Sequence, residues 1–186
     1  MRVISGIARG INLKTPDGLE TRPTADRVKE ALFSILQFDV PCTRVLDLFA
    51  GTGQLGIEAL SRGADSCVFV DERDTACKVV RENLKRTKFE SRGKVVRSDY
   101  HLFLKNCKEK FDIIILDPPY AEKFLENSLN LITEIDILQS NGIIVAERPL
   151  GKELPFEFEG YLRSKDYKYG KTLITLFRKV EEKSVL

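Results

Sequence analysis

The sequence predicts an α/β fold in which a mostly parallel β-sheet is covered by helices on both faces. Short apolar runs rich in β-branched residues alternate with longer helical patterns, and one such run leads through a glycine-rich turn into a helix. Residues 113–116 are apolar without alternation, as in a strand that is buried on both faces. A chain of 186 residues is about the size of one domain, so we expect residues 1–186 to form a single domain.

The first forty residues precede the main sheet and are expected to form an extension of a core over residues 41–179. Residues 1–14 alternate loosely in hydrophobicity between two glycines and predict a small β-hairpin. Thr24 is a candidate N-cap for a helix over residues 24–37, which has an apolar stripe on one face. Basic residues are modestly enriched in this extension.

From residue 44 the chain alternates between expected strands and helices. The first five strands are expected over residues 45–49, 67–70, 94–97, 112–116 and 142–147. The helices are expected over residues 55–62, 75–88, 100–107 and 123–137. Two last strands, over 161–167 and 172–177, flank a short turn and predict a hairpin, which a plain dinucleotide-binding fold lacks.

The composition is typical of a soluble globular protein. Hydrophobic residues make up 42% and charged residues 31% of the chain, and no apolar run approaches the roughly 20 residues of a membrane span. No signal peptide is recognisable, and the four cysteines lack metal-ligand spacing. We therefore expect free thiols in the cytoplasm, no bound metal and no membrane partner. A net charge of +2 is too small to identify a nucleic-acid binder.

The glycine turn indicates a nucleotide cofactor. Gly51, Gly53 and Gly56 satisfy G-x-G-x-x-G between a strand and a helix, and Asp71 follows about twenty residues later, the spacing of a ribose-binding carboxylate. Nicotinamide dinucleotides and S-adenosylmethionine both place a ribose on such an acid. Asp47 favours the second, because its charge would oppose a pyrophosphate but suits an ammonium and a sulfonium.

Polar residues follow two further expected strands. Ser98 and Asp99 lie where the edge of an adenine would reach in a doubly wound sheet. Asp117, Pro118, Pro119 and Tyr120 end the strand over 112–116, and the prolines stiffen a loop that has few backbone N–H donors. A carboxylate, carbonyl acceptors and a flat ring match a planar ligand with an amino group, such as the exocyclic amine of a nucleobase.

These motifs together resemble the class I S-adenosylmethionine-dependent amino-methyltransferases. The shared pattern is Asp-x-Phe-x-Gly-x-Gly, an acid at the second strand and Asp-Pro-Pro-Tyr at the fourth. Residues 2–10 and the stretch Leu-Glu-Thr-Arg-Pro-Thr-Ala-Asp-Arg-Val over residues 19–28 are similar to the amino-terminal signature of the RsmD-type 16S ribosomal RNA guanine-N2 methyltransferases. The resemblance extends to about residue 179. It implies a Rossmann-like seven-strand sheet with a small N-terminal hairpin, and methylation of a guanine in small-subunit ribosomal RNA.

The resemblance also implies roles for individual residues. Asp47, Phe49, Gly51 and Gly53 would form the cofactor loop, Asp71 the ribose contact, and Ser98 and Asp99 the adenine side. The catalytic loop would be Asp117, Pro118, Pro119 and Tyr120. The chain departs from the family at Arg73, where an acid is frequent. We expect the basic extension to bind phosphates of RNA in a small-subunit particle or assembly intermediate, without an obligate protein partner, through Arg2, Arg9, Arg22, Arg27 and Lys29.

Three alternatives stay open from the residues alone. An N6-adenine methyltransferase acting on DNA or RNA would use the same loop, since both bases present an exocyclic amine. A nicotinamide-dependent dehydrogenase would leave the loop over 117–120 without a role. A non-catalytic RNA-binding protein on a degenerate methyltransferase fold would not need the intact residues of both loops.

Overall fold

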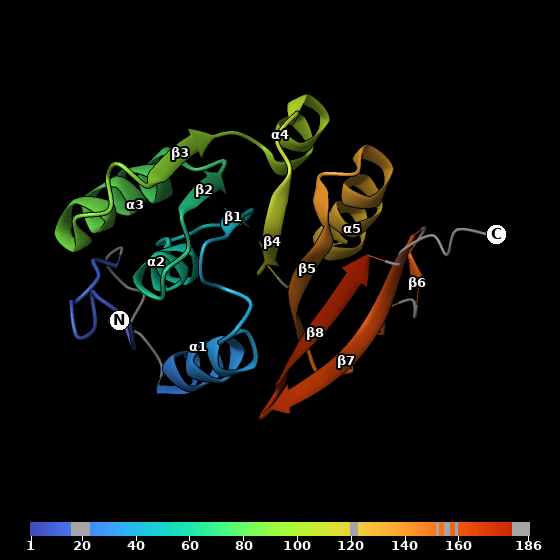
Figure 1. The fold of residues 1–186 in the computed structure, drawn as a ribbon, viewed down its shortest axis with the longest axis horizontal. Helices are drawn as coiled ribbons and strands as arrows, with labels where there is room; N and C mark the ends of the chain where they lie inside the picture. The colour runs from blue at the N-terminus through green and yellow to red at the C-terminus, as the bar shows by residue number, and fades with distance from the viewer. Residues whose placement is uncertain (16–22, 120–122, 152, 155–156, 159, 180–186) are drawn as a thin grey trace.

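The computed structural model describes residues 1–15, 23–119, 123–151, 153–154, 157–158 and 160–179, with only the backbone for residues 23–25, 157 and 158 (Figure 1). These residues form a mixed sheet in the order β3-β2-β1-β4-β5-β8-β7-β6. The strands are β1 (Arg44–Asp47), β2 (Ser66–Asp71), β3 (Gly93–Arg97), β4 (Phe111–Leu116), β5 (Leu138–Pro149), β6 (Glu157–Phe158), β7 (Tyr161–Tyr169) and β8 (Thr172–Lys179).

Strands β1 to β5 run parallel to one another, and β8, β7 and β6 continue the sheet from β5 in antiparallel pairs. The predicted seven-strand α/β sheet is thereby confirmed, with the two-residue β6 added at its edge. Leaving β6 aside, a parallel sheet that closes with an antiparallel hairpin is the arrangement that the sequence predicted from the turn over residues 168–171.

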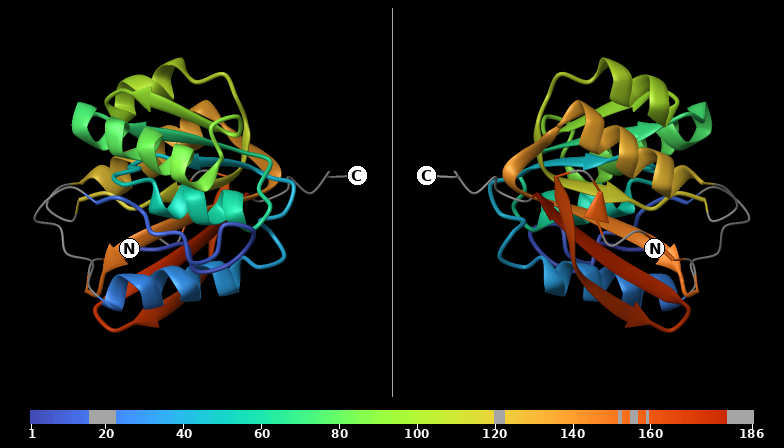
Figure 2. Two further views of the ribbon diagram at one scale, coloured as in Figure 1. Left: turned by 90° about the vertical axis from the view of Figure 1, so that its left-hand side faces the viewer. Right: turned by 90° about the vertical axis from the view of Figure 1, so that its right-hand side faces the viewer.

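Helices cover both faces of this sheet (Figures 1 and 2). They are α1 (Pro23–Ile35), α2 (Gln54–Ser61), α3 (Asp74–Thr87), α4 (Tyr100–Asn106) and α5 (Phe124–Ile135). Apolar residues of α1, α2 and α3 share one buried cluster with alternate strand residues such as Val45, Ile115 and Val145. The intervening strand residues, such as Leu46 and Ile114, pack with α4 and α5. A period of two along each strand therefore divides the core into two layers.

The N-terminal segment (residues 1–15) is held against α2 by two side chains far along the chain. The Glu58 carboxylate accepts the backbone N–H groups of Ile4 and Ser5 at 2.8 and 2.9 Å. Ser61 accepts the N–H of Ala8 on its hydroxyl at 3.0 Å and the N–H of Ile7 on its carbonyl at 2.9 Å. Buried acceptors on α2 thus fix the shape of the segment.

The two parts of the extension differ from their predicted bounds. The two arms of the N-terminal segment pair antiparallel about one isolated bridge, between Arg2 and Asn12, and the N–H groups of Val3 and Leu13 donate to the carbonyls of Ile11 and Met1 at 3.0 and 2.9 Å, so the pairing is shorter than two full strands. Helix α1 begins at Pro23, one residue before the predicted cap Thr24, and ends at Ile35. Proline suits the first helical position because the missing N–H needs no partner there.

Strand β5 is longer than predicted and contains an irregularity. Its pairing with β4 shifts between Phe111↔Leu138 and Ile113↔Ile143. At Gly142 a Cβ would lie 2.6 Å from a side-chain atom of Leu138 and 3.0 Å from the carbonyl oxygen of Asp112. Only glycine fits this close approach, and the shifted register carries β5 on toward the edge where β4 ends.

None of the helices within the described residues has the length and apolarity needed to cross a membrane.

Candidate functional site

The predicted site residues gather at the carboxyl ends of the parallel strands β1, β2, β3 and β4. Polar loops at this edge bind ligands in open α/β sheets, because side chains from neighbouring strands converge there. The loops after β1, β2 and β3 form the cofactor half of the site. The ends of β4 and β5 form the base half.

The glycine turn adopts the geometry that its sequence predicts. Gly53 has φ +75°, and a Cβ at this position would lie 3.1 Å from the side chain of Val80. A Cβ on Gly56 would lie 2.3 Å from the ring of Phe69, so its absence lets α2 pack directly against β2. Gly51 also has a positive φ, +55°. The turn therefore needs glycine for its backbone conformation and for close packing.

Asp71 ends β2 beside this turn. One carboxylate oxygen accepts the N–H of Gly51 at 2.9 Å, and the other accepts the N–H of Arg73 at 3.0 Å. The guanidinium of Arg73 adds two contacts of 3.1 Å, one to each oxygen. Asp71 is thus at the predicted place, and it also ties the glycine turn to the end of β2. The guanidinium of Arg73 was not foreseen as its partner.

Asp47 lies beneath the turn and does not face solvent. Its side chain is 1% exposed, and one carboxylate oxygen accepts the N–H of Gly56 at 3.0 Å. Burial, aided by the charge of Asp71 and opposed by the Gly56 N–H, raises the pKa of Asp47 to about 7. This carboxylate therefore positions the first turn of α2, and its interaction with the charges of a cofactor stays a prediction.

Three aromatic rings from three loops meet at the same edge. Phe49 follows β1, Tyr100 follows β3 and Phe124 begins α5, and their ring centroids lie 5.5 to 6.2 Å apart. All three are half-buried. Phe49 is one of the predicted cofactor residues, whereas no sequence pattern predicts its contact with Tyr100 and Phe124. Phe49 and Tyr100 pack against the buried layer that includes residues of α4 and α5, so the cluster supplies apolar ring surface beside the loop after β1.

Ser98 and Asp99 lie between β3 and α4. The Asp99 carboxylate caps α4 by accepting the N–H groups of His101 and Leu102 at 2.9 and 3.1 Å, and the Ser98 hydroxyl donates to the Asp99 carbonyl at 2.9 Å. Their contact with an adenine stays a prediction. The structure adds a capping role that the sequence reasoning missed, although Asp before a helical run is a capping signal.

Asp117 and Pro118 extend the chain beyond β4, next to the glycine turn, because β1 and β4 are neighbours and Asp47 pairs with Ile115. Asp117 is half-buried. Burial raises the pKa of the Asp117 carboxyl, and the negative charges of Glu147 and Asp47 raise it further. Pro119 is exposed. Tyr120 lies outside the described residues.

The predicted RNA-binding residues differ in exposure. Arg2, Arg9 and Arg27 are exposed, and Arg22 lies outside the described residues. Lys29 is 1% exposed; its ammonium donates to the Arg2 carbonyl at 2.6 Å and lies 3.9 Å from the Glu58 carboxylate. Burial lowers the pKa of Lys29, although the charge of Glu58 opposes this. The prediction that Lys29 binds phosphate is therefore wrong, because its ammonium is buried against the Arg2 carbonyl and the Glu58 carboxylate.

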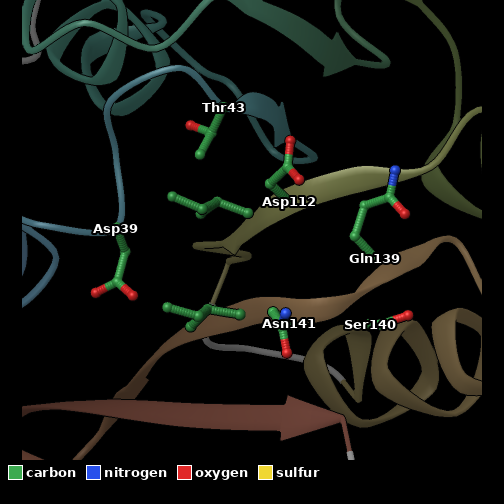
Figure 3. Close-up of a pocket in the computed structure, with 8 residues that line it drawn as sticks. Asp39, Thr43, Asp112, Gln139, Ser140 and Asn141 are labelled. Atoms are coloured by element: carbon green, nitrogen blue, oxygen red, sulfur yellow. The ribbon is translucent and has the colours of Figure 1, made fainter.

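A polar hollow of about 350 Å³ lies at the opposite end of the parallel strands, where β1 and β4 begin (Figure 3). It is lined by Asp39, Thr43, Asp112, Ile113, Gln139, Ser140, Asn141 and Ile143. Asp112 accepts the N–H of Arg44 at 2.7 Å, and Asp39 pairs with Arg178 at 3.4 Å. These carboxylates therefore have structural partners, and the hollow is far along the strands from the glycine turn.

The cofactor half fits S-adenosylmethionine on the chemistry of its groups. Within the described residues, the buried side-chain oxygen of Gln54 has no hydrogen-bond partner, and Gln54 begins α2 directly after Gly53. That oxygen is an acceptor available to the ammonium of a methionine moiety. The turn, the acid at β2 and the Asp-Pro-Pro loop on this sheet define an S-adenosylmethionine-dependent methyltransferase.

Comparison with known proteins narrows this class. A family model described as conserved hypothetical protein 95 matches residues 1–178. The chain is 41% identical over 182 residues to a putative ribosomal RNA methyltransferase, YlbH, of Bacillus subtilis, covering 96% of this chain and 99% of that protein. It is 36% identical to the ribosomal RNA small subunit methyltransferase D of Haemophilus influenzae, covering 83% and 81%. A solved putative methyltransferase of Escherichia coli, yhhF, superimposes with a TM-score of 0.88 at 28% identity, covering 98% and 99%.

The chain belongs to this family, the RsmD family of methyltransferases. The resemblance stated from the sequence is thereby confirmed.

Proposed function

We propose that this protein transfers a methyl group from S-adenosylmethionine to the exocyclic N2 of a guanine in small-subunit ribosomal RNA. The observation that carries the proposal is the position of Asp117 and Pro118 at the end of β4, beside the glycine turn after β1. Relatives named as ribosomal RNA methyltransferases support the choice of RNA. When bound, S-adenosylmethionine supplies an electrophilic methyl group on a sulfonium.

The loop after β4 orients the exocyclic amine of the target base. The lone pair of an exocyclic amine is delocalised into the base, so the nitrogen has to be reoriented before it attacks a methyl group. Asp117 and the carbonyl of Pro118 accept its two N–H groups and favour a tetrahedral nitrogen. Tyr120 would stack on a base that has turned out of its helix. No metal or covalent nucleophile is needed for this step.

The test is methyl transfer to RNA and DNA with a labelled methyl group, followed by mass spectrometry of the nucleosides. N2-methylguanosine in small-subunit RNA is the expected product, and N6-methyladenosine would contradict the base assignment. The basic extension offers little surface for reading a sequence, so shape should select the substrate. We expect faster transfer to a small-subunit particle or assembly intermediate than to an oligonucleotide of the same sequence; equal rates would contradict recognition by shape.

The basic side chains of the extension provide a separate test. We expect Arg2, Arg9, Arg22 and Arg27 to contact RNA phosphates, so each Arg→Gln change should lower the salt slope of RNA binding by about one unit. Lys108→Gln, an exposed lysine between α4 and β4, is the matched control. Lys29→Gln should leave the slope unchanged and lower the free energy of unfolding. A quadruple Arg→Gln variant with the slope of the unchanged protein would show that this face is only solvated.

A further inference from the structure

Glu147 lies beside Asp117, two residues before the end of the neighbouring strand β5. The register of β4 and β5 pairs Ile115 with Val145 and Leu116 with Ala146, so the next residues along both chains are Asp117 and Glu147. Residues opposite each other in neighbouring strands project to the same face of a sheet. Asp47, which pairs with Ile115, belongs to this face as well. The ends of β1, β4 and β5 therefore carry a row of three carboxylates on one face.

The three carboxylates differ in exposure: the one on β1 is buried, and the two at β4 and β5 are more exposed. Asp47 is buried and occupied by the Gly56 N–H, whereas Asp117 and Glu147 are half-buried at the edge. The negative charge of Glu147 acts on the Asp117 carboxyl and helps to raise its pKa, which shows that the two groups are close enough to interact. A ligand with several N–H groups lying against both carboxylates would be attracted by their combined negative charge.

The Watson–Crick edge of guanine has the matching chemistry. It presents N1–H and the two N–H groups of N2 side by side, which are three donors, and an ionised carboxylate only accepts. Asp117 and the Pro118 carbonyl take the two N2–H groups in the proposed reaction, which leaves N1–H without an acceptor. Adenine presents a lone pair at N1, which a second carboxylate would repel.

We propose that Glu147 is a specificity-determining residue that accepts N1–H of the target guanine. This inference rests on the proposed transfer to guanine N2 and extends it, because the loop over residues 117–120 alone does not distinguish guanine from adenine. Glu147 does not act on the methyl group, and it selects the base that can be held in front of Asp117. A site built to accept one N–H discriminates against an analogue that presents a lone pair in its place, because the carboxylate and the lone pair repel each other.

The probe is 2-aminopurine, which keeps the exocyclic amine at C2 but has an unprotonated N1. An RNA fragment is made with guanine or 2-aminopurine at the methylated position, which is mapped first, and single-turnover rates are compared. The unchanged protein should prefer guanine by about 100-fold in kcat/KM. A preference below about threefold would overturn the proposal without any variant.

Variants of Glu147 sharpen the test. Glu147→Gln can donate an N–H to the N1 lone pair of 2-aminopurine, so its preference for guanine should shrink to about tenfold or less, with a higher rate on 2-aminopurine. Glu147→Asp keeps the carboxylate and should retain most of the preference. Glu134→Gln, an exposed glutamate on α5, is the matched control and should retain the full preference. An unchanged preference in a folded Glu147→Gln protein would overturn the proposal.

The outcomes separate this proposal from the proposed function. If the unchanged protein makes N2-methylguanosine and Glu147→Gln keeps the preference for guanine over 2-aminopurine, only the role of Glu147 fails. If the unchanged protein makes N6-methyladenosine, the transfer to guanine itself fails. A uniform loss of rate on both bases, with the same ratio, would indicate a structural role for Glu147 and would also overturn the proposal.

Discussion

In the cofactor half of the site the Asp71 carboxylate is surrounded by N–H groups of Gly51 and Arg73, whereas in the base half Asp117 faces other negative charges. The first carboxylate holds protein groups in place before any ligand arrives. The second is poorly compensated by the described residues around it. The comparison suggests that the cofactor half is prepared by the protein, and that the base half is completed by the N–H groups of its substrate.

The largest effect should come from the base half. Asp117→Asn replaces one of the two carboxyl oxygens with an N–H donor, so kcat should fall about 1,000-fold, or about 4 kcal/mol, with the affinity for S-adenosylmethionine nearly unchanged. Single-turnover kinetics and calorimetry measure the two quantities. Asp112→Asn, at the other end of β4, is the matched control. A kcat above about a tenth of the original would refute this role for Asp117.

The buried Asp47 makes stability depend on pH. Its pKa is raised to about 7 in the folded protein, so the folded state binds a proton more tightly than the unfolded chain does. The free energy of unfolding should therefore be highest below the unfolded pKa and fall by about 2 to 3 kcal/mol between about pH 5 and pH 8. Urea unfolding measures it. Asp47→Asn keeps an acceptor for the Gly56 N–H and should fall less over this range; an equal fall would place the proton elsewhere.

In the cofactor half, Asp71→Ala should weaken the binding of S-adenosylmethionine by about 1.5 to 3 kcal/mol, the cost of losing hydrogen bonds to a charged acceptor. Calorimetry on the purified protein measures the affinity. Asp74→Ala, three residues later and paired with Lys78, is the control and should bind normally. Unchanged affinity in Asp71→Ala would remove Asp71 from the site.

The smallest effect concerns Arg73. A carboxylate accepts about four hydrogen bonds, and Gly51 and Arg73 already supply four N–H contacts to Asp71. A ribose would have to displace one, and the guanidinium, on a side chain that is 61% exposed, is the most mobile of them. Arg73→Met should therefore increase the affinity for S-adenosylmethionine by about threefold, or under 1 kcal/mol, because an exposed ion pair contributes little. A decrease would show that Arg73 assists binding.

The sequence predicted well what depends on local patterns. The glycine turn, Asp71 and the loop at Asp117 follow from residues that are close in sequence and need particular backbone shapes. Glu147 was missed because it is a single acid at the end of an apolar run, and its meaning depends on the register between β4 and β5. Register depends on the irregularity near Gly142, which no short motif reveals.

The burial of Lys29 has a partial signal in the sequence. Phe33 and Leu36 follow it at the spacing of one helix face and are both fully buried, so a lysine in their row was a candidate for burial. Its partner Glu58 is distant in sequence and on another helix, and only the packing of α1 near α2 brings the two together. Long-range ion pairs of this kind leave no periodic signal.

The attachment of the N-terminal segment to Glu58 and Ser61 also bears on how the protein is made. During synthesis, residues 4–8 cannot dock until α2, more than fifty residues later, has emerged and folded. Lys14 must wait longer, because its backbone N–H is bound by Asn83 of α3 at 2.7 Å. Closing such loops costs chain entropy before any contact forms. A nascent chain would therefore gain its basic segment in the folded arrangement only after the cofactor loop exists, so an unfinished copy would lack the folded surface proposed to bind RNA.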